Sequence, residues 1–352
     1  MGYINIILIS FAILYMLAST AMSQTFPKDW PMNPAPPEPL GLDGNWPQAD
    51  VGPPPTPNFT KLIDLSKVAN APVNPSPVAC GTNLPNDPFC NWSCTGCTRA
   101  TDVVKCPNDL DWGLSFDDGP TVFTNTLLDY LESQNVRVTF FVIGSRVIQN
   151  PSILQKAFKA GHQIGVHTWS HPLLTSQSNE QIIAELSWTK LAIQTAINVT
   201  PIYMRPPFGD YDDRVRGICQ QLNLTPTIWD LDTNDWMSQA YKNFQLDSIP
   251  NNFSEWVSDP NLMNKGHISL QHDLFNQTVN LVPLVVPIIK KANYNIKPIS
   301  TCIGDNKPYL ENIVLESSNS INYPNIQNDN TNNSTSNKSS SPNASNSTKL
   351  FI

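Results

Sequence analysis

The sequence of 352 residues has little positive charge. It contains 21 Lys and Arg residues against 29 Asp and Glu residues, which gives a formal net charge of −8. A protein of this charge has no electrostatic attraction to a nucleic-acid backbone, so nucleic acid is excluded as an expected partner. The sequence also lacks an internal repeat of fixed period, which excludes the repeat architectures. Its length instead suits one large domain with flanking segments, or two domains.

An apolar run opens the chain, but it is too short and too early for a settled membrane span. It lies within residues 1–23, and Ala21 and Ser23 give the small-x-small pattern of a cleavage site just before Gln24. We expect residues 1–23 to be a secretory signal peptide, which predicts a secreted protein of the extracellular space or cell wall. After cleavage no stable membrane span would remain. Because the first residues lack the usual Lys or Arg, an uncleaved N-terminal anchor stays the alternative.

Glycine is scarce relative to proline, with 15 Gly against 32 Pro, and the prolines are unevenly placed. Residues 24–79 are rich in Pro and Asn and show no helical periodicity, which predicts a disordered, linker-like segment. Residues 305–352 consist largely of Asn and Ser, so we expect a disordered tail that forms no core. Asn-x-Ser/Thr triplets support a glycosylated extracellular protein. They include Asn58, Asn91, Asn198, Asn223, Asn252 and Asn276.

Seven cysteines are unevenly distributed, and five of them precede residue 107. In an oxidising compartment the stretch CNWSCTGC (residues 90–97) indicates a disulfide cluster rather than a zinc site. Residues 80–105 are therefore defined as a Cys-rich lead-in. The odd count leaves one thiol over, and Cys219, at an apolar position of an expected helix, is the candidate for a free buried thiol. We expect Cys302 to be bridged to one of the five early cysteines.

Residues 106–304 alternate between short β-rich runs and helical stretches. The expected strands are residues 112–116, 136–144, 162–167, 201–207, 225–232, 266–272 and 294–300. Helices are expected over residues 124–134 with Thr124 as N-cap, over 178–198 with a Ser178–Gln181 capping box, and from Asp212 onward. The alternation predicts an α/β fold with a parallel sheet covered by helices. Seven strands favour a distorted, incomplete (β/α) barrel over an open sheet.

Ionisable side chains lie at or just after the ends of five of the expected strands. They are Asp117 and Asp118, His167 and His171, Arg205, Asp232 and Asp235, and His272 and Asp273. In barrels of this kind the reactive residues lie at the C-terminal ends of the strands, so these side chains are expected to converge on one mouth. A solvated surface is a poor explanation for five such strand ends.

His167 and His171 lie four residues apart, so one turn of helix would bring both imidazoles to the same side. Two His and one carboxylate form a common catalytic zinc set with open positions, and the adjacent Asp117 and Asp118 offer that carboxylate. A metal in such a set lowers the pKa of water, and the second aspartate can then act as general base. The alternatives are two unrelated loop histidines and an Asp-Asp-Gly-Pro turn that only caps the following helix.

Other residues at the strand ends suit supporting roles. Arg205 can pair with the base and hold it ionised. His272 can be the general acid, and either Asp235 or Asp232 can hydrogen-bond to it and raise its pKa. Trp236 offers a flat apolar wall for a sugar ring or an acetyl methyl group. The two histidines at strand starts, His162 and His267, are expected to be structural.

Five motifs, in this order and spacing, resemble those of the polysaccharide deacetylases, the NodB-homology fold of carbohydrate esterase family four. They are SFDDGP (115–120), HTWSH (167–171), RPPFGD (205–210), DTNDW (232–236) and SLQH (269–272). The set is highly specific, although any single motif is not. The resemblance covers about residues 106–303. Within the family, a secreted and glycosylated chain is most similar to the fungal chitin deacetylases.

The resemblance implies a role for each matching residue. The implied catalytic residues are Asp117 as base, Arg205 as the residue that orients it, His272 as acid and Asp235 as the partner of the acid. The implied metal ligands are Asp118, His167 and His171. The implied substrate contacts are Trp236, Leu270 in the acetyl pocket, and the backbone N–H of Phe208 at the oxyanion. Family members often carry Tyr at the position of Phe208, but since the backbone acts there, Phe should serve equally.

The implied function is the metal-dependent removal of N-acetyl groups from chitin, a β-1,4-linked N-acetylglucosamine polymer, to give chitosan and acetate. Zinc is the expected metal, and cobalt also suits a His-His-Asp set. We expect a catalytic domain over residues 106–304 that acts as a monomer. The alternatives are a deacetylase of acetylxylan or peptidoglycan, and a non-catalytic carbohydrate-binding wall protein. A glycosidase is disfavoured because its two carboxylates must flank the scissile bond.

Overall fold

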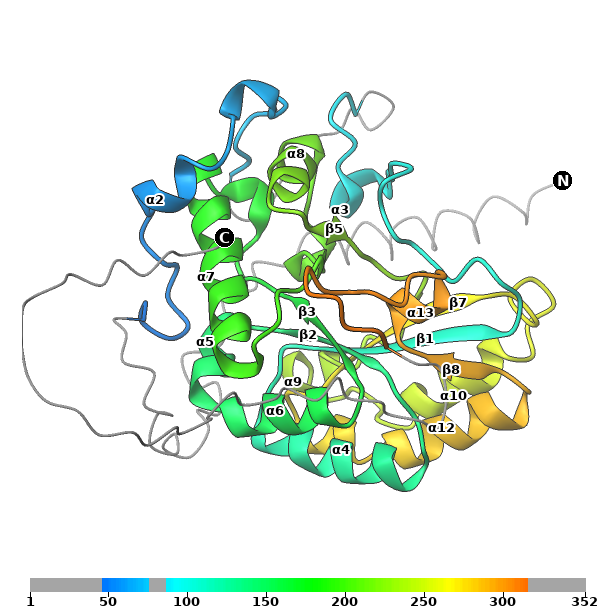
Figure 1. The fold of residues 1–352 in the computed structure, drawn as a ribbon. Helices are drawn as coiled ribbons and strands as arrows, with labels where there is room; N and C mark the ends of the chain where they lie inside the picture. Colours follow the sequence, from blue (N-terminus) through cyan, green and yellow to red (C-terminus); the bar gives the residue numbers. More distant parts are fainter. Residues whose placement is uncertain (1–45, 76–86, 316–352) are drawn as a thin grey trace, which may run out of the picture. The chain divides into compact units, whose positions relative to one another are not determined.

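Strand β1 (Asp111–Asp117) is the central strand of a parallel sheet (Figure 1). The computed structural model describes residues 46–75 and 87–315. All seven residues of β1 are buried, and both edges of the strand are paired: β7 lies along one edge, while β2 and β8 share the other. The further strands are β2 (Thr139–Val142), β3 (Gln163–Val166), β4 (Tyr203–Met204), β5 (Thr225–Pro226), β6 (Leu231–Asp232), β7 (His267–His272) and β8 (Asn295–Lys297).

The sheet follows the order β5-β4-β3-β2-β1-β7-β6, and every neighbouring pair is parallel. This is the strand order of a barrel that stays open between β5 and β6. The prediction of an α/β fold with an incomplete (β/α) barrel of about seven strands is therefore confirmed. The short strand β8 is an eighth member, which pairs with β1.

Residues 225–232, predicted as one strand, form two short strands at opposite ends of the sheet. β5 pairs with β4, whereas β6 pairs with β7. The segment changes its hydrogen-bond partner between these two strands. The Thr227 N–H donates to the carbonyl of Met204 in β4 at 2.8 Å, whereas the Asp230 N–H donates to the carbonyl of Ile268 in β7 at 3.1 Å. One straight strand cannot pair with both ends of the sheet, so the gap in the barrel lies at this segment.

Helices connect the strands, as the alternation in the sequence predicts (Figure 1). The longer ones are α4 (Val122–Ser133), α6 (Pro151–Lys159), α7 (Asn179–Ile197), α8 (Asp213–Gln221), α10 (Ser248–Trp256) and α12 (Val282–Lys291). The shorter ones are α2 (Pro57–Thr60), α3 (Trp92–Thr95), α5 (Gly144–Gln149), α9 (Met237–Ala240), α11 (Asn276–Val279) and α13 (Ile299–Cys302). Three 3₁₀ turns are η1 (Leu65–Lys67), η2 (Leu174–Ser176) and η3 (Pro207–Gly209).

Two predicted helix starts are confirmed and one is wrong. Helix α7 begins with the Ser178–Gln181 capping box, and Asp212 caps α8 by accepting the Val215 N–H. Helix α4, however, has Thr121 as N-cap instead of Thr124. Thr124 is the third residue of the helix, and its side chain closes a capping box with Thr121, so the two threonines act together.

Residues 46–75, within the segment expected to be a disordered linker, instead pack against the barrel. Phe59 and Ile63 are each 6% exposed and belong to the main core cluster. Trp46 stacks on Trp169 with ring centroids 6.1 Å apart. A few large apolar side chains therefore anchor a Pro-rich chain that has almost no helix of its own. The signal peptide predicted over 1–23 and the rest of the linker lie outside the described residues.

The first residues of the expected tail also pack against the barrel. Tyr309 is 3% exposed, and its hydroxyl accepts the N–H of Ile164 in β3 at 3.0 Å. Asp305 accepts a hydrogen bond from Tyr203 in β4, and Leu315 is buried. The Asn- and Ser-rich part of the predicted tail, residues 316–352, lies outside the described residues.

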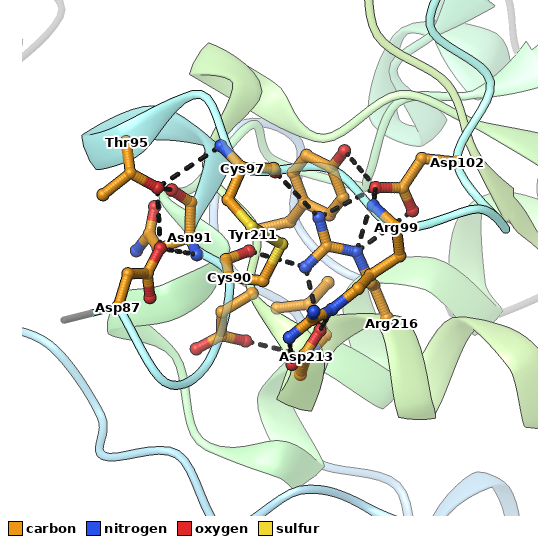
Figure 2. A network of polar contacts seen from close by, with 12 residues as sticks. Asp87, Cys90, Asn91, Thr95, Cys97, Arg99, Asp102, Tyr211, Asp213 and Arg216 are labelled. Carbon is orange, nitrogen blue, oxygen red and sulfur yellow. Dashed lines mark hydrogen bonds and ion pairs between the residues drawn. A yellow bond between two sulfur atoms is a disulfide. The ribbon is translucent and has the colours of Figure 1, made fainter. Parts of the chain in front are cut away.

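The Cys-rich lead-in is attached to helix α8 by a polar network (Figure 2). A disulfide joins Cys90 to Cys97, and the Arg216 guanidinium donates to the carbonyl oxygens of both residues, at 2.6 and 3.3 Å. Arg216 also pairs with Asp102, whose carboxylate in turn accepts the Tyr211 hydroxyl. A second ion pair joins Arg99 to Asp213, so the lead-in is attached to α8 by more than one charged contact.

The predicted glycosylation sites differ in exposure. Asn91 is buried, and its side-chain oxygen caps α3 by accepting the Cys94 N–H at 3.2 Å. An asparagine in this position is poorly placed to carry a glycan. Four of the other sequon residues are exposed: Asn58, Asn198, Asn223 and Asn276.

Both cysteine predictions outside the lead-in cluster are confirmed. Cys302 is bonded to Cys106, 196 residues away, and this bond joins the start of the barrel domain to its end. Cys219 is free and buried in α8. Within residues 46–75 and 87–315, no helix combines the length and apolar character that crossing a membrane requires.

Truncation of Phe59 should show that the Pro-rich segment contributes to stability. The Phe59 ring packs edge-on against Trp188 in the core, with the two ring centroids 5.4 Å apart. Phe59→Ala should therefore lower the free energy of unfolding by about 3–5 kcal/mol. Leu62→Ala, in the same segment but 49% exposed, should change it by less than about 0.5 kcal/mol. Denaturant unfolding measures both variants, and equal midpoints for Phe59→Ala and the wild type would mean that the segment is not packed.

Candidate metal and catalytic site

The residues that the sequence singles out meet at one edge of the sheet. Asp117 ends β1 and lies opposite His272 in the parallel register with β7. His167 follows β3 directly, and Arg205 follows β4. Because the strands are parallel, their carboxyl ends share this edge, and the predicted convergence on one mouth holds for these four residues.

Asp118, His167 and His171 form a group suited to a metal ion. Asp118 Oδ1 lies 3.4 Å from His167 Nε2 and 3.3 Å from His171 Nε2, and the three ligand atoms are all within 4.8 Å of one another. Asp118 Oδ1 is buried, and no hydrogen bond to it is found within the described part of the chain. A buried carboxylate oxygen that faces two imidazole nitrogens fits a divalent cation.

The protonation of these three side chains also favours a metal. His167 Nδ1 lies 2.7 Å from the Arg205 carbonyl; an Nδ1–H that donates to this oxygen leaves the Nε2 lone pair for a cation. Burial lowers the pKa of His171 to about 3, so its imidazole is neutral. Burial opposes ionisation of Asp118, but His171 and His167 outweigh it and hold the pKa of Asp118 below its usual range. The set therefore offers one carboxylate oxygen and two imidazole nitrogens to a cation.

The histidine motif does not form the predicted turn of helix. Residues 167–171 are an irregular loop, with Thr168 and His171 in the left-handed region at φ 63° and 61°. The buried carboxylate of Glu185 in α7 accepts the N–H groups of Trp169 and Ser170, at 2.8 and 2.9 Å, and holds the loop in this conformation. The two imidazoles therefore meet across an irregular loop and not through helical spacing.

Asp117 forms a buried ion pair with Arg205. Arg205 Nη1 donates to Asp117 Oδ1 at 2.9 Å and to Ser115 Oγ at 2.8 Å. The guanidinium is fully buried and lies over the Phe141 ring, 4.3 Å from its centroid. With this many contacts Arg205 has one orientation, and it fixes the orientation of the Asp117 carboxylate.

His272 is paired with Asp235. His272 Nδ1 lies 2.6 Å from Asp235 Oδ1, and the His272 N–H donates to Asp235 Oδ2 at 2.8 Å. Asp232, the other candidate partner, instead accepts the backbone N–H of Asn234. Burial lowers the pKa of His272, but Asp235 outweighs this effect and raises the pKa to about 10. His272 is therefore protonated at neutral pH in the metal-free protein.

The expected substrate contacts surround these pairs. Phe208 is left-handed at φ 59°, and its ring lies 4.5 Å from that of His171. The next residue is Gly209, also left-handed at φ 63°; a Cβ there would lie 2.0 Å from the Trp92 ring, so the lead-in packs directly on this loop. Trp236 is partly exposed at the start of α9, and Leu270 is buried in β7 opposite Ser115. Their roles toward substrate stay predictions.

Three buried charged residues at this site receive no role from the sequence. Glu185 holds the histidine loop, and Arg146 and Asp273 contact the turn that follows Asp118. Asp273 directly follows His272, so its place at a strand end is visible in the sequence. Arg146 and Glu185 lie on helices, and nothing in their local sequence distinguishes them from surface residues.

Comparisons with known proteins agree with the motifs. A family model described as polysaccharide deacetylase matches residues 105–227. Chitin deacetylase 1 of Cryptococcus neoformans var. grubii is 41% identical over 299 residues, which cover 78% of this chain and 62% of that protein. Chitin deacetylase 1 of Saccharomyces cerevisiae is 36% identical over 223 residues, which cover 63% of this chain and 69% of that protein. The chain thus spans less than two thirds of the Cryptococcus protein.

A solved structure is similar as well. The chitin deacetylase from the fungal pathogen Colletotrichum lindemuthianum matches with a TM-score of 0.55 and 26% identity. The match covers 63% of this chain and 98% of that chain, so nearly the whole of the solved protein has a counterpart here.

Removing the charge of Asp235 should lower the pKa of His272. A nearby opposite charge shifts a pKa by about 1–3 units, so Asp235→Asn should lower the imidazole pKa by that amount. NMR titration of the imidazole signals in the metal-free protein measures it. Asp232→Asn is the control, because Asp232 bonds to Asn234 and should give a smaller shift. An unchanged pKa in Asp235→Asn would contradict the pairing.

Proposed function

This chain belongs to the polysaccharide deacetylase family, and from this membership we propose that it is a metal-dependent hydrolase that removes N-acetyl groups from chitin to give chitosan and acetate. The observation that carries the proposal is the group Asp118, His167 and His171 beside the Asp117–Arg205 pair. Chitin as substrate is supported by the names of the fungal relatives.

We assign Asp118, His167 and His171 as the ligands of a divalent metal, zinc in the first place and cobalt as an alternative. When bound, such a metal lowers the pKa of water and polarises the acetyl carbonyl. The ligand set leaves open coordination positions, because two His and one carboxylate fill only three.

Asp117 is proposed as the general base. Its carboxylate lies beside the ligand group, with Oδ2 3.7 Å from His167 Nε2. Arg205 donates to this carboxylate and fixes its orientation, and the carboxylate accepts the proton of the attacking water. The proton leaves the water as its oxygen forms a bond to the acetyl carbon.

His272 is proposed as the general acid. It starts protonated, with the proton on Nδ1 shared with Asp235, and donates from its other nitrogen to the leaving amine as the carbon–nitrogen bond breaks. The backbone N–H of Phe208 is proposed to stabilise the oxyanion. The left-handed backbone of Phe208 sets the direction of this N–H. Trp236 and Leu270 are proposed to contact the sugar and the acetyl methyl group.

A deacetylase of acetylxylan or peptidoglycan would use the same residues, so substrate identity needs a direct comparison. The purified full chain is incubated with defined chitin oligomers, acetylxylan and peptidoglycan, and acetate release and product masses are measured. We expect loss of acetyl groups from chitin oligomers at the highest kcat/KM. Equal or faster release from either of the other polymers would overturn chitin as substrate, and release from none would favour a carbohydrate-binding protein.

Further proposals concern the organisation of the whole protein. We propose a signal peptide over residues 1–23, secretion to the extracellular space or cell wall, and a monomeric catalytic domain over residues 106–304. The disulfides and the exposed sequons support secretion. The buried contacts of residues 46–75 support counting this segment as part of the folded domain.

The two adjacent aspartates should respond differently to zinc. Asp117→Asn should retain metal but lower kcat by about 10²–10⁴-fold at any zinc concentration, because it removes a positioned general base. Asp118→Asn should lose metal affinity, because a neutral amide replaces an anionic ligand, and should recover partly as zinc is raised. Acetate release during zinc titration, with bound metal measured in parallel, separates them.

Two results would contradict these assignments. Loss of zinc by Asp117→Asn with retention by Asp118→Asn would mean that the two roles are exchanged. Unchanged rates of acetate release in both variants would mean that Asp117 and Asp118 have no catalytic role and only form the turn before α4.

A further inference from the structure

The turn that follows Asp118 has a backbone that its residue type disfavours. Asp118 lies in the left-handed region at φ 82°, which side chains with a Cβ seldom adopt. A residue in this conformation points its side chain in a different direction from a normal strand residue. The direction of the Asp118 carboxylate therefore depends on whatever keeps this backbone in place.

The four backbone polar groups of Asp118 and Gly119 are all bonded. The two outer groups are the Asp118 N–H and the Gly119 carbonyl, and both bond to backbone. The Asp118 N–H donates to the carbonyl of Phe141, within β2, at 3.2 Å, and the Gly119 carbonyl accepts the N–H of Ile143, just after β2, at 3.0 Å. The two inner groups, the Asp118 carbonyl and the Gly119 N–H, belong to one and the same peptide group. They bond to side chains, Asp273 and Arg146, instead of to backbone.

One arginine and one aspartate hold this peptide group from its two ends. Arg146, in α5, donates from Nη1 to the Asp118 carbonyl at 2.7 Å. Asp273, after β7, accepts the Gly119 N–H with Oδ1 at 2.8 Å. Arg146 is 9% exposed and Asp273 is fully buried. Hydrogen bonds to charged groups are the stronger kind, so the pair resists rotation of the peptide group.

We propose that Arg146 and Asp273 are positioning residues that clamp the Asp118–Gly119 peptide and thereby aim the Asp118 carboxylate at the metal. The clamp rests on the proposed metal centre, but neither residue is a ligand and neither belongs to the catalytic pairs. Arg146 precedes the histidine motif in the sequence and Asp273 follows the proposed general acid. Both would act on the metal centre through Asp118.

The close approach of Asp273 explains why position 119 is glycine. A Cβ on Gly119 would lie 2.2 Å from Asp273 Oδ2, a distance that no side chain tolerates. Asp273 also ties the end of β7 to the end of β1, since its N–H donates to the Asp117 carbonyl at 3.2 Å and its Oδ2 accepts the Thr124 hydroxyl. These two contacts fix the position of the Asp273 carboxylate independently of its bond to the Gly119 N–H.

The charge of Arg146 allows positioning to be distinguished from electrostatics. A guanidinium beside a metal ligand repels a cation, so removing it should tighten metal binding if charge were its only effect. A positioning role predicts the opposite result. Loss of a partner that orients a metal ligand typically weakens metal affinity by about 10–100-fold.

The test measures zinc affinity of the purified full chain after removal of metal, by competition with a chromophoric chelator, together with thermal unfolding of each metal-free variant. Arg146→Met and Asp273→Ala should each bind zinc about 10–100-fold more weakly. Asp273→Asn keeps an acceptor for the Gly119 N–H, so its zinc affinity should stay within about threefold of wild type, a smaller loss than the roughly 10–100-fold expected of the other two variants. Lys190→Met is the matched control, because Lys190 is also buried and donates to one backbone carbonyl, that of Leu222, away from the site.

Each outcome decides the proposal. Weakened zinc binding by Arg146→Met and Asp273→Ala, with wild-type affinity in Lys190→Met at a similar loss of thermal stability, supports the clamp. Zinc binding by those two variants that equals or exceeds wild type overturns it. Should Arg146→Met fail to fold, the difference between Asp273→Ala and Asp273→Asn decides, and equal affinities overturn the clamp. Absence of zinc binding by the wild-type chain would instead overturn the metal centre itself.

Discussion

Two adjacent carboxylates buried at the end of one central strand set the requirement that the rest of the site meets. Asp117 and Asp118 are both almost inaccessible, and a buried charge without a partner is strongly unfavourable. Arg205 neutralises Asp117, whereas Asp118 Oδ1 faces the Nε2 atoms of His167 and His171 and is left for a cation. A third carboxylate, Asp273, lies close by, and burial, with a contribution from Asp118, raises its pKa to about 7.

The parallel sheet is what makes this concentration of charge possible. β1 pairs with β7 in a register that sets Asp117 opposite His272, so the proposed base and acid start on neighbouring strands. Arg205 reaches Asp117 from β4, three strands away in the sheet, because the side chain crosses the barrel interior over Phe141. The open gap between β5 and β6 does not disturb these contacts, since each of them comes from the paired strands or from the loop that follows β6.

The sequence predicts the parts of the site that depend on strand periodicity, and not those that depend on contacts between distant segments. Strand ends, and hence Asp117, His167, Arg205 and His272, follow from local pattern. The choice of Asp235 over Asp232 does not, because it depends on where the loop after β6 turns. The packing of residues 46–75 is also hidden, since Pro-rich composition indicates a linker while single apolar residues such as Phe59 decide the outcome. The helical reading of the histidine motif is wrong because Glu185, far along the chain, holds its backbone.

The left-handed residues of the site show where folding energy supports function. Asp118, His171 and Phe208 each have positive φ, which costs a residue with a Cβ about 1–2 kcal/mol. Each of them has a contact from elsewhere in the chain. Arg146 and Asp273 bond to the peptide group after Asp118, and Glu185 bonds to the loop that contains His171. The Trp92 ring packs against Gly209, the residue after Phe208. These contacts act on backbone, so the geometry of the motif residues is set by residues outside the motifs. We therefore expect a chain that carried all five motifs but lacked these supports to direct the same side chains differently, so that the ligand atoms of Asp118 and His171 no longer face a common point.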